Sequence, residues 1–221
     1  MTQHRSSILQ PSAEWESLFH SYRPLQISYA PGEMICQAGS YLAGIHLIVQ
    51  GVVSDMMLTQ TGEPRNCDIL SAGDLIGLET LENDSAGLSI SLCRALTCVD
   101  LLFIEGSQFA SALDDHPALL RTVFHYAVSR VVHTRKDSRH QTSFETQLCR
   151  LLLRLGDACG LPTAGNTVSL PSEVSLRTLG DILCLSTRQL RHARQAIQHL
   201  VIRESGIEFD VEEARQIIRS E

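Results

Sequence analysis

The stretch Leu176–Gln195, LRTLGDILCLSTRQLRHARQ, decides the fold of this chain. Its spacing is that of a helix-turn-helix motif, in which two short helices meet across a tight turn. Gly180 supplies the small residue required where the two helices touch, and Ser186 is placed to cap the second helix through its hydroxyl group. The apolar positions that the motif buries are Leu179, Leu183, Leu185, Leu190 and Ala193.

One position departs from the usual composition of the motif. Cys184 occupies the turn position that glycine usually fills. We therefore expect a non-glycine residue in the left-handed backbone conformation at this point, at a cost of roughly 1–2 kcal/mol.

The second helix, predicted over residues 187–200, has a polar outer face. Its inner face is defined by Leu190, Ala193, Ile197 and Leu200, and its outer face carries Arg188, Arg191, His192, Gln195 and His199. Arginine pairs with guanine, glutamine pairs with adenine, and the first half of such a helix enters the major groove of DNA. The predicted DNA contacts are Ser186, Thr187, Arg188, Arg191, His192 and Gln195, with Arg177 and Arg203 on phosphates.

A module of the same fold that has lost DNA binding and contacts another protein is the alternative. It is favoured by the net charge of −7, by Cys184 in the turn and by the presence of a single lysine, Lys136. The acidic groups are concentrated in the first half, since residues 1–112 carry four basic and twelve acidic side chains. Binding that weakens steeply with salt and survives only on particular sequences distinguishes DNA recognition from this alternative.

The first half of the chain is rich in glycine, with eight of the fourteen glycines between Gly32 and Gly87. Short alternating or apolar runs separated by turn signals predict an all-β domain. We expect a double-stranded β-helix, or β-roll, of jelly-roll type over residues 1–116. The predicted strands are Ile45–Val49, Val52–Leu58, Cys67–Leu70, Leu88–Leu92 and Val99–Ile104.

A long helix is predicted over residues 117–143. One stripe at heptad spacing contains Leu120, Phe124, Ala127, Val131 and Thr134, which is typical of a parallel dimer seam. The alternative is a helix that simply packs on the β-roll. A second stripe, Val123, Val128 and Val132, is available to face the roll at the same time.

Residues 144–221 are predicted to form a winged helix-turn-helix domain, which makes the whole chain an α+β protein. A helix is expected over Gln147–Leu155, a loop from Gly156 to Thr167 and a strand over Val168–Leu170. A hairpin from Ile202 to Val211, with Ser205 and Gly206 at its tip, and a last polar helix follow the motif.

Composition excludes several classes of protein. Hydrophobic residues make up 43% of the 221 residues and charged residues 19%, which is typical of a globular protein. No apolar run approaches the roughly 20 residues of a membrane span, and residues 1–10 lack the apolar core of a secretory signal, so we expect a cytoplasmic protein. The motifs of phosphate-binding, zinc-protease and serine-hydrolase enzymes are missing, and we expect no enzymatic activity.

The order of these features resembles the Crp/Fnr family of bacterial transcription regulators over residues 25–215. The resemblance rests on the barrel pattern of Pro31-Gly32-Glu33 with Gly39, Gly51 and Gly62, on Ala72–Glu79, and on Leu185–Leu190 at the start of the recognition helix. It implies a homodimer on a palindromic operator. It also implies double-stranded DNA, a second copy of the chain and RNA polymerase as partners, and no membrane.

The resemblance places a ligand site in the β-roll, at Gly77, Leu78 and Glu79 and at Leu88 and Ser89. Family members that bind a cyclic nucleotide have an Arg-Ser or Arg-Thr pair at the latter position. That arginine is missing here, and a buried phosphate without a cation is costly. We therefore expect no cyclic nucleotide binding in the usual mode, unless a different register allows Arg94 to substitute.

Members of the family that this chain resembles also hold other cofactors. The Fnr branch holds an iron–sulfur cluster with N-terminal cysteines, but no cysteine precedes Cys36, and the seven cysteines contain no Cys-x-x-Cys pair. Some relatives bind haem through a histidine, and His46 lies on a predicted strand of the roll. A haem-based gas sensor is therefore a further alternative. The prediction is no cofactor and no metal.

Overall fold

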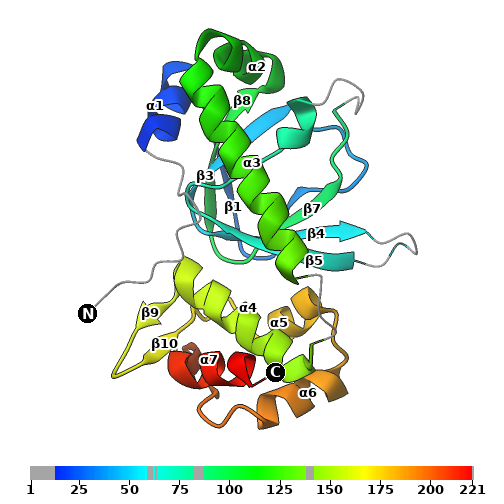
Figure 1. Cartoon of the computed structure of the whole chain (residues 1–221), viewed down its shortest axis with the longest axis vertical. Helices are drawn as coiled ribbons and strands as arrows, with labels where there is room; N and C mark the ends of the chain where they lie inside the picture. Colours follow the sequence, from blue (N-terminus) through cyan, green and yellow to red (C-terminus); the bar gives the residue numbers. More distant parts are fainter. Residues whose placement is uncertain (1–12, 59–61, 63, 82–86, 138–141, 221) are drawn as a thin grey trace. The chain divides into compact units, whose positions relative to one another are not determined.

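The computed structural model describes residues 13–58, 62, 64–81, 87–137 and 142–220. Contacts divide the chain into two compact units, residues 1–53 with 70–139 and residues 54–69 with 140–221. The predicted α+β fold is confirmed: a β-roll, a long helix and a helical domain with a small sheet follow one another along the chain (Figure 1). Among the described residues, no helix is both long enough and apolar enough to span a membrane.

The first sheet of the roll has the strand order β1-β8-β3-β6, and its strands are β1 (Leu25–Tyr29), β8 (Val99–Glu105), β3 (Gly44–Gln50) and β6 (Leu75–Ile76). Its strand pairings are antiparallel, with His46 opposite Phe103 on one side and Ile76 on the other. Side chains alternate between the two faces of a strand. Ile45 and Leu47 accordingly belong to one apolar cluster and Ile48 to another.

Three helices contribute to the cluster on one face of this sheet. They are α1 (Ala13–Ser21), α2 (Gly106–Asp115) and α3 (Pro117–Asp137). The rings of Phe19 and Phe109 pack with their centroids 6.0 Å apart, and Val123 and Tyr126 of α3 are buried in the same cluster. The Tyr126 hydroxyl donates to Asp74 Oδ1 and accepts from the Leu75 amide, both at 3.0 Å. This buried pair of hydrogen bonds fixes α3 against the turn before β6.

The second sheet has the order β2-β7-β4-β5, and its strands are β2 (Met34–Cys36), β7 (Ser91–Ala95), β4 (Val52–Leu58) and β5 (Pro64–Ser71). The prediction of a strand over Leu88–Leu92 was wrong, because the strand begins at Ser91. Ser89 instead pairs with an earlier loop, donating its amide to Ser40 O and accepting from the Gly39 amide. Leu88 forms an isolated bridge with Tyr41.

Gly77 precedes the short 3-10 helix η1 (Leu78–Leu81). Its φ of +96° lies in the left-handed region, and a Cβ atom there would lie 2.5 Å from the Gly44 carbonyl oxygen. Only glycine fits this close approach, which sets the position of η1 beside β3.

The C-terminal domain, described over residues 142–220, contains four helices: α4 (Phe144–Cys159), α5 (Leu176–Leu183), α6 (Thr187–Gln195) and α7 (Val211–Arg219). Its sheet has the order β11-β12-β10-β9, formed by β11 (Val201–Arg203), β12 (Gly206–Asp210), β10 (Thr167–Ser169) and β9 (Leu161–Pro162). β11 and β12 form the predicted hairpin. The unit is closed by the buried side chains of Leu148, Leu152, Leu179, Ile207 and Phe209.

Two predicted helix boundaries were wrong. α4 begins at Phe144 because Ser143 caps it by accepting the Thr146 amide. It also continues through Gly156, where the predicted loop was to begin, and a Cβ atom at this glycine would lie only 3.0 Å from Cζ of Phe209. The long helix ends at Asp137 within the described residues, and residues 138–141 lie outside them.

Candidate nucleic-acid interface

The contact between α5 and α6 depends on Gly180. A Cβ atom on Gly180 would lie 2.8 Å from Cδ2 of Leu190, so a larger residue would force the buried Leu190 side chain to move. Cys184 ends α5 with φ 54° and ψ 36°, the left-handed conformation predicted for it. Both features set the angle at which α6 leaves the turn.

The first turn of α6 is closed by a capping box. The backbone N–H of Gln189 donates to Oγ of Ser186 at 3.3 Å, and the backbone N–H of Ser186 donates to the side-chain Oε1 of Gln189 at 2.8 Å. These bonds satisfy backbone donors that the helix itself leaves unpaired. The predicted cap at Ser186 is confirmed, and α6 begins with a fixed end.

α6 is shorter than predicted, since it ends at Gln195 rather than at residue 200. Its apolar pattern continues because Ile197 and Leu200 remain buried in the turn that follows. Glu213 of α7 holds this turn, accepting the amides of Gln198 at 2.7 Å and His199 at 2.9 Å. The His199 ring lies 3.1 Å from the same carboxylate, so its predicted place on the outer helical face was wrong.

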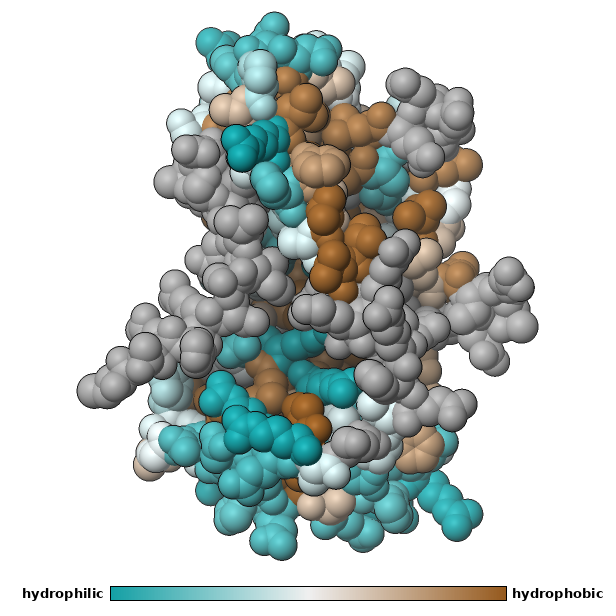
Figure 2. Space-filling view, in the orientation of Figure 1, coloured by the Kyte–Doolittle hydropathy of each residue, from teal (hydrophilic) through white to brown (hydrophobic). Residues whose placement is uncertain are grey.

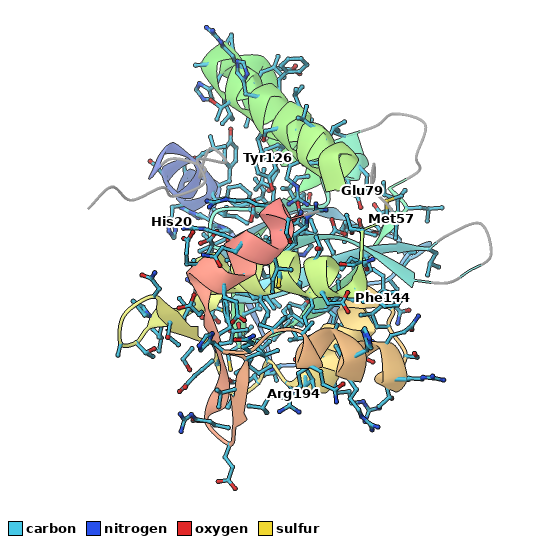
Figure 3. The ribbon with its side chains drawn as sticks, turned by 60° about the horizontal axis from the view of Figure 1, so that its bottom comes forward. His20, Met57, Glu79, Tyr126, Phe144 and Arg194 are labelled. Atoms are coloured by element: carbon cyan, nitrogen blue, oxygen red, sulfur yellow. The ribbon has the colours of Figure 1, made fainter. Side chains whose placement is uncertain are left out.

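The outer face of α6 is exposed to solvent, while its inner face is buried. Leu190 and Ala193 are buried. Arg194 also extends from this short helix (Figure 3). The exposed side chains that were predicted to contact DNA are Ser186, Thr187, Arg188, Arg191, His192 and Gln195 on or beside α6, with Arg177 on α5 and Arg203 on β11.

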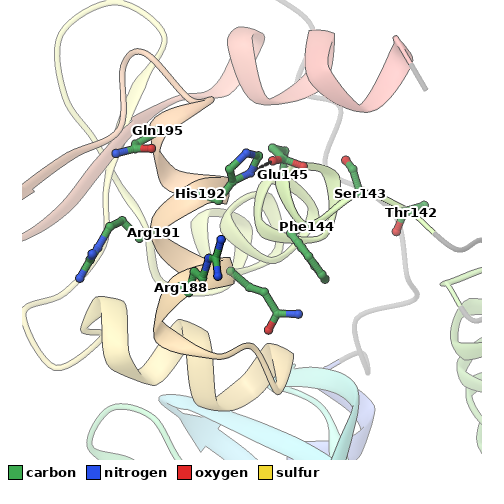
Figure 4. Close-up of a pocket in the computed structure, with 9 residues that line it drawn as sticks. Thr142, Ser143, Phe144, Glu145, Arg188, Arg191, His192 and Gln195 are labelled. Atoms are coloured by element: carbon green, nitrogen blue, oxygen red, sulfur yellow. Dashed lines mark hydrogen bonds and ion pairs between the residues drawn. The ribbon is translucent and has the colours of Figure 1, made fainter.

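An open pocket of about 660 Å³ lies between the outer face of α6 and the first turn of α4 (Figure 4). Its lining residues are Thr142, Ser143, Phe144, Glu145, Arg188, Gln189, Arg191, His192 and Gln195. Four of the predicted DNA contacts therefore line one recess. The positive end of the α4 dipole lies at the same place and favours an anion there.

Glu145 is the acidic member of this pocket. Its Oε1 lies 2.8 Å from Nδ1 of His192, the contact drawn as a dashed line in Figure 4. Hydrogen bonding to its own backbone amide and to His192 lowers the pKa of Glu145, against the opposing effect of burial. The carboxylate is therefore ionised at neutral pH and offsets part of the positive charge of α6.

Arg203, on the hairpin, is also paired. Its Nε lies 3.1 Å from Oε2 of Glu208 on the neighbouring strand. A phosphate contact by Arg203 requires this exposed ion pair to open, and such pairs contribute no more than about 1 kcal/mol.

An apolar surface runs along α3. Leu120, Phe124 and Val131 are at least half exposed, and Phe124 reaches 62%. The second stripe does not face the roll as a whole: Val123 is buried, but Val128 and Val132 are 43% and 46% exposed. Figure 2 shows apolar side chains gathered over α3 and the roll beside it. Ala127 is partly buried, and the Thr134 side chain lies outside the described residues.

The predicted ligand residues of the roll are only partly brought together. The Ser89 hydroxyl is buried and lies 3.2 Å from Oε1 of Glu79, on the helix that follows Gly77, while Leu78 is half-buried. Leu88, in contrast, is exposed. A carboxylate therefore stands beside the serine of the expected phosphate position, where an anionic ligand would be repelled.

His46 lies on β3, where its ring packs on Phe103 with centroids 4.9 Å apart. Its side chain is 7% exposed, and Nδ1 has no hydrogen-bond partner among the described residues. Burial lowers the pKa of His46 to about 4, so the imidazole is neutral at physiological pH.

Sequence reasoning missed Glu145, Gln189 and Glu213. The Ser-x-x-Gln spacing from Ser186 to Gln189 is a capping-box signature and was sufficient to identify Gln189. Glu145 and Glu213 contact residues 47 and 14–15 positions away, and no local pattern indicates such pairs.

A domain of the cyclic nucleotide-binding type followed by a winged helix-turn-helix is the class that this fold defines. Residues 26–116 match the family model of the cyclic nucleotide-binding domain. None of the curated protein sequences matches the chain. The fold of the whole chain is similar to that of solved structures described as Crp/Fnr-family regulators, as the resemblance in the sequence led us to expect.

Three solved structures illustrate the likeness. FixK2 from Bradyrhizobium japonicum is 15% identical with a TM-score of 0.70, and the match covers 88% of this chain and 96% of FixK2. The c-di-GMP-responsive global regulator CLP from Xanthomonas campestris is 18% identical with a TM-score of 0.70, over 90% and 99% of the two chains. A Crp/Fnr-family regulator from Thermus thermophilus is 14% identical with a TM-score of 0.66, over 88% and 98%.

Proposed function

We propose that the protein is a sequence-specific DNA-binding transcription regulator that acts as a homodimer. The observation that carries this proposal is the outer face of α6, where Arg188, Arg191 and Gln195 are exposed on a helix whose inner face is buried. Guanidinium and amide groups read base edges in the major groove through paired hydrogen bonds. A fixed helix start at Ser186 presents them at a defined angle.

The surrounding groups position the duplex. Arg177 and Arg203, outside α6, contact phosphates on either side of the reading helix, which sets the register without reading sequence. The first turn of α4, together with Arg188 and Arg191, lines a recess suited to a phosphate. Glu145 limits the attraction of this recess for any anion, so base contacts rather than charge alone determine which DNA sequence the protein binds.

The dimer forms through α3. Leu120, Phe124, Val128, Val131 and Val132 expose an apolar face at helical spacing on a 21-residue helix. Leu120, Phe124 and Val131 of this face belong to the predicted heptad stripe, so a second copy of the same helix is the partner that fits it. Two copies related by a two-fold axis read a palindrome whose half-sites lie about 34 Å apart, one turn of DNA.

The β-roll does not take a cyclic nucleotide in the usual mode, since the contact between Ser89 and Glu79 places a carboxylate where a cation is needed. CLP is described as responsive to c-di-GMP, and CprK is described in complex with OCPA, so proteins of this fold serve different ligands. The roll of this chain senses a signal of another kind or supports the dimer. No cofactor is proposed, and an absorption spectrum of freshly purified protein tests this, because haem and iron–sulfur clusters absorb visible light.

Selection of bound duplexes from a random double-stranded library tests the proposal. The expected result is an enriched palindrome with half-sites one helical turn apart. The proposal would be contradicted if no sequence were enriched and if a higher salt concentration abolished binding to all duplexes alike. That outcome favours the protein–protein interaction module. The observations that support this alternative are the contacts of His192 with Glu145 and of Arg203 with Glu208, which already occupy two of the predicted DNA-binding side chains. Recruitment of RNA polymerase and the absence of enzymatic activity remain predictions.

A further inference from the structure

Two cysteines face each other inside the β-roll. Cys36 on β2 is the direct cross-strand partner of Cys93 on β7 in an antiparallel pairing. Both side chains are buried, with exposures of 5% and 1%, and both belong to the same apolar cluster. Neither takes part in a disulfide bond. The two thiols are therefore adjacent and reduced in a buried part of the fold.

The surroundings of Cys36 differ from those of an inert core cysteine. Its Sγ accepts from the Ser89 hydroxyl and donates to the Ser91 carbonyl oxygen, each at 3.7 Å. Hydrogen bonding from the Cys93 thiol is the largest influence on Cys36 and lowers the pKa of its thiol, while burial and the Glu79 carboxylate oppose it. Elsewhere in the described chain, burial raises the pKa of Cys149 to about 12 and that of Cys159 to about 11.

We propose that Cys36 and Cys93 are a modification site, a thiol pair that hydrogen peroxide converts into a disulfide between β2 and β7. Their cross-strand placement carries the proposal. Directly opposed residues of antiparallel strands have Cα atoms about 4.5–5.5 Å apart, within the roughly 4.4–6.8 Å that a disulfide spans. β2 is an outer strand of its sheet, and the register shifts between Met34 and Cys36, so this strand has room to adjust.

The reaction proceeds in two balanced steps. The Cys36 thiolate attacks one peroxide oxygen, the O–O bond breaks, and one water leaves after taking up the thiol proton, which gives a sulfenic acid. The Cys93 sulfur then attacks the Cys36 sulfur. The S–S bond forms, the S–O bond breaks, and the second water carries away the Cys93 proton. The two thiols lose two electrons, and peroxide is reduced to two waters.

The site lies beside Ser89, the residue at the expected ligand position of the roll. A disulfide would tie β2 to β7 at this point and remove the Cys36 thiol from its contacts with Ser89 and Ser91. The proposal concerns the modification itself and does not depend on DNA binding by α6.

Peptide mapping of the full chain by mass spectrometry tests the proposal. The folded protein is treated with stoichiometric hydrogen peroxide, unfolded in denaturant with iodoacetamide, and digested. The expected product is one cross-linked peptide pair that contains Cys36 and Cys93, lacks two hydrogens and disappears after reduction with dithiothreitol. Recovery of both cysteines in alkylated form, or of Cys36 as a sulfinic acid with Cys93 alkylated, would overturn the proposal.

Substitutions distinguish Cys36, which attacks the peroxide, from Cys93, which resolves the sulfenic acid. In Cys93→Ser, a dimedone adduct is expected on Cys36, because no thiol is left to resolve the sulfenic acid. In Cys36→Ser, Cys93 is expected to remain reduced. Cys149→Ser, a change at another buried cysteine, is the matched control and should leave the cross-linked pair unchanged. A cross-link from Cys36 to any other cysteine would contradict the assignment, and the mapping of the unsubstituted chain decides the question even where a variant does not fold.

Discussion

Nδ1 of His192 lies 2.8 Å from Oε1 of Glu145, a contact that joins the outer face of α6 to the first turn of α4. The pair places one ionised carboxylate within a recess whose lining also contains two arginines, Arg188 and Arg191. It fixes the His192 ring and reduces the attraction of the recess for phosphate. If α6 binds DNA as proposed, we expect this carboxylate to hold the affinity for DNA of any sequence below what the arginines alone would give.

Glu145→Gln is expected to raise the affinity for unrelated duplexes by about threefold to tenfold, since it removes a negative charge near the phosphates and retains a hydrogen-bonding group. Fluorescence anisotropy with duplexes of scrambled sequence measures this. Asp114→Asn, on the exposed end of α2, makes the same change in net charge and is the control. Equal affinities for Glu145→Gln and the parent protein would show that α4 does not approach the duplex.

Val131→Asp is expected to convert the dimer into a monomer, because it places a charge opposite its own symmetry mate in the α3 seam. Sedimentation velocity measures the change. Ala118→Asp, an exposed position near the start of α3 and away from the apolar face, should remain dimeric. A dimeric Val131→Asp would mean that another surface forms the dimer.

His46 should give the β-roll a stability that depends on pH. The folded-state pKa of about 4 lies below the ordinary value of 6.5, so the unfolded chain binds the extra proton between these values. Stability is therefore full above pH 6.5, falls as the pH drops toward 4, and loses at most about 3 kcal/mol from this group. Urea unfolding at a series of pH values measures the effect, and His46→Gln should lack this part of the slope. An NMR titration that places the pKa of His46 near 6.5 would refute the explanation.

Cyclic AMP and cyclic GMP are expected to show no saturable binding below millimolar concentrations. The Glu79 carboxylate beside Ser89 repels their phosphate, and the acidic first half of the chain disfavours any anion. Titration calorimetry is the direct measurement. A micromolar dissociation constant for either nucleotide would identify a phosphate partner other than the expected position, with Arg94 on β7 as the first residue to substitute.

The helix contact, the turn and the cap of the helix-turn-helix could be predicted because their determinants are local, whereas Leu183 and Leu185, which were predicted to be buried, are only half-buried. Gly180, Cys184 and Ser186 act on neighbours within ten residues, and the structure bears out the small contact, the left-handed turn and the cap. The end of α6 could not be predicted in this way. Ile197 and Leu200 keep the helical pattern of burial, whereas the helix stops because Glu213 accepts backbone amides from a distant part of the sequence.

The β-roll shows the same limit. Glycines and alternating runs indicated its strands, but the strand expected over residues 88–92 begins at residue 91 because Ser89 pairs with a loop some fifty residues earlier. The opposition of Cys36 and Cys93 likewise depends on which strands become neighbours. Strand pairing across long loops is set by the packing of the whole sheet, and the alternation within one strand does not encode it.

The central claim is that the outer face of α6 reads DNA sequence, and the affinity of Arg188→Ala for a selected palindrome tests it most directly. Anisotropy titrations would compare the parent protein, Arg188→Ala and the control Arg215→Ala, an exposed arginine on α7, on the palindrome and on a scrambled duplex at the same salt concentration. Because Arg188→Ala removes a base contact, we expect it to bind the palindrome more weakly by about 1–3 kcal/mol and to lose most of its discrimination against the scrambled duplex. Its fold should be unchanged, and Arg215→Ala should bind both duplexes as the parent protein does. An unchanged preference for the palindrome in Arg188→Ala would contradict the assignment of α6 as the reading helix.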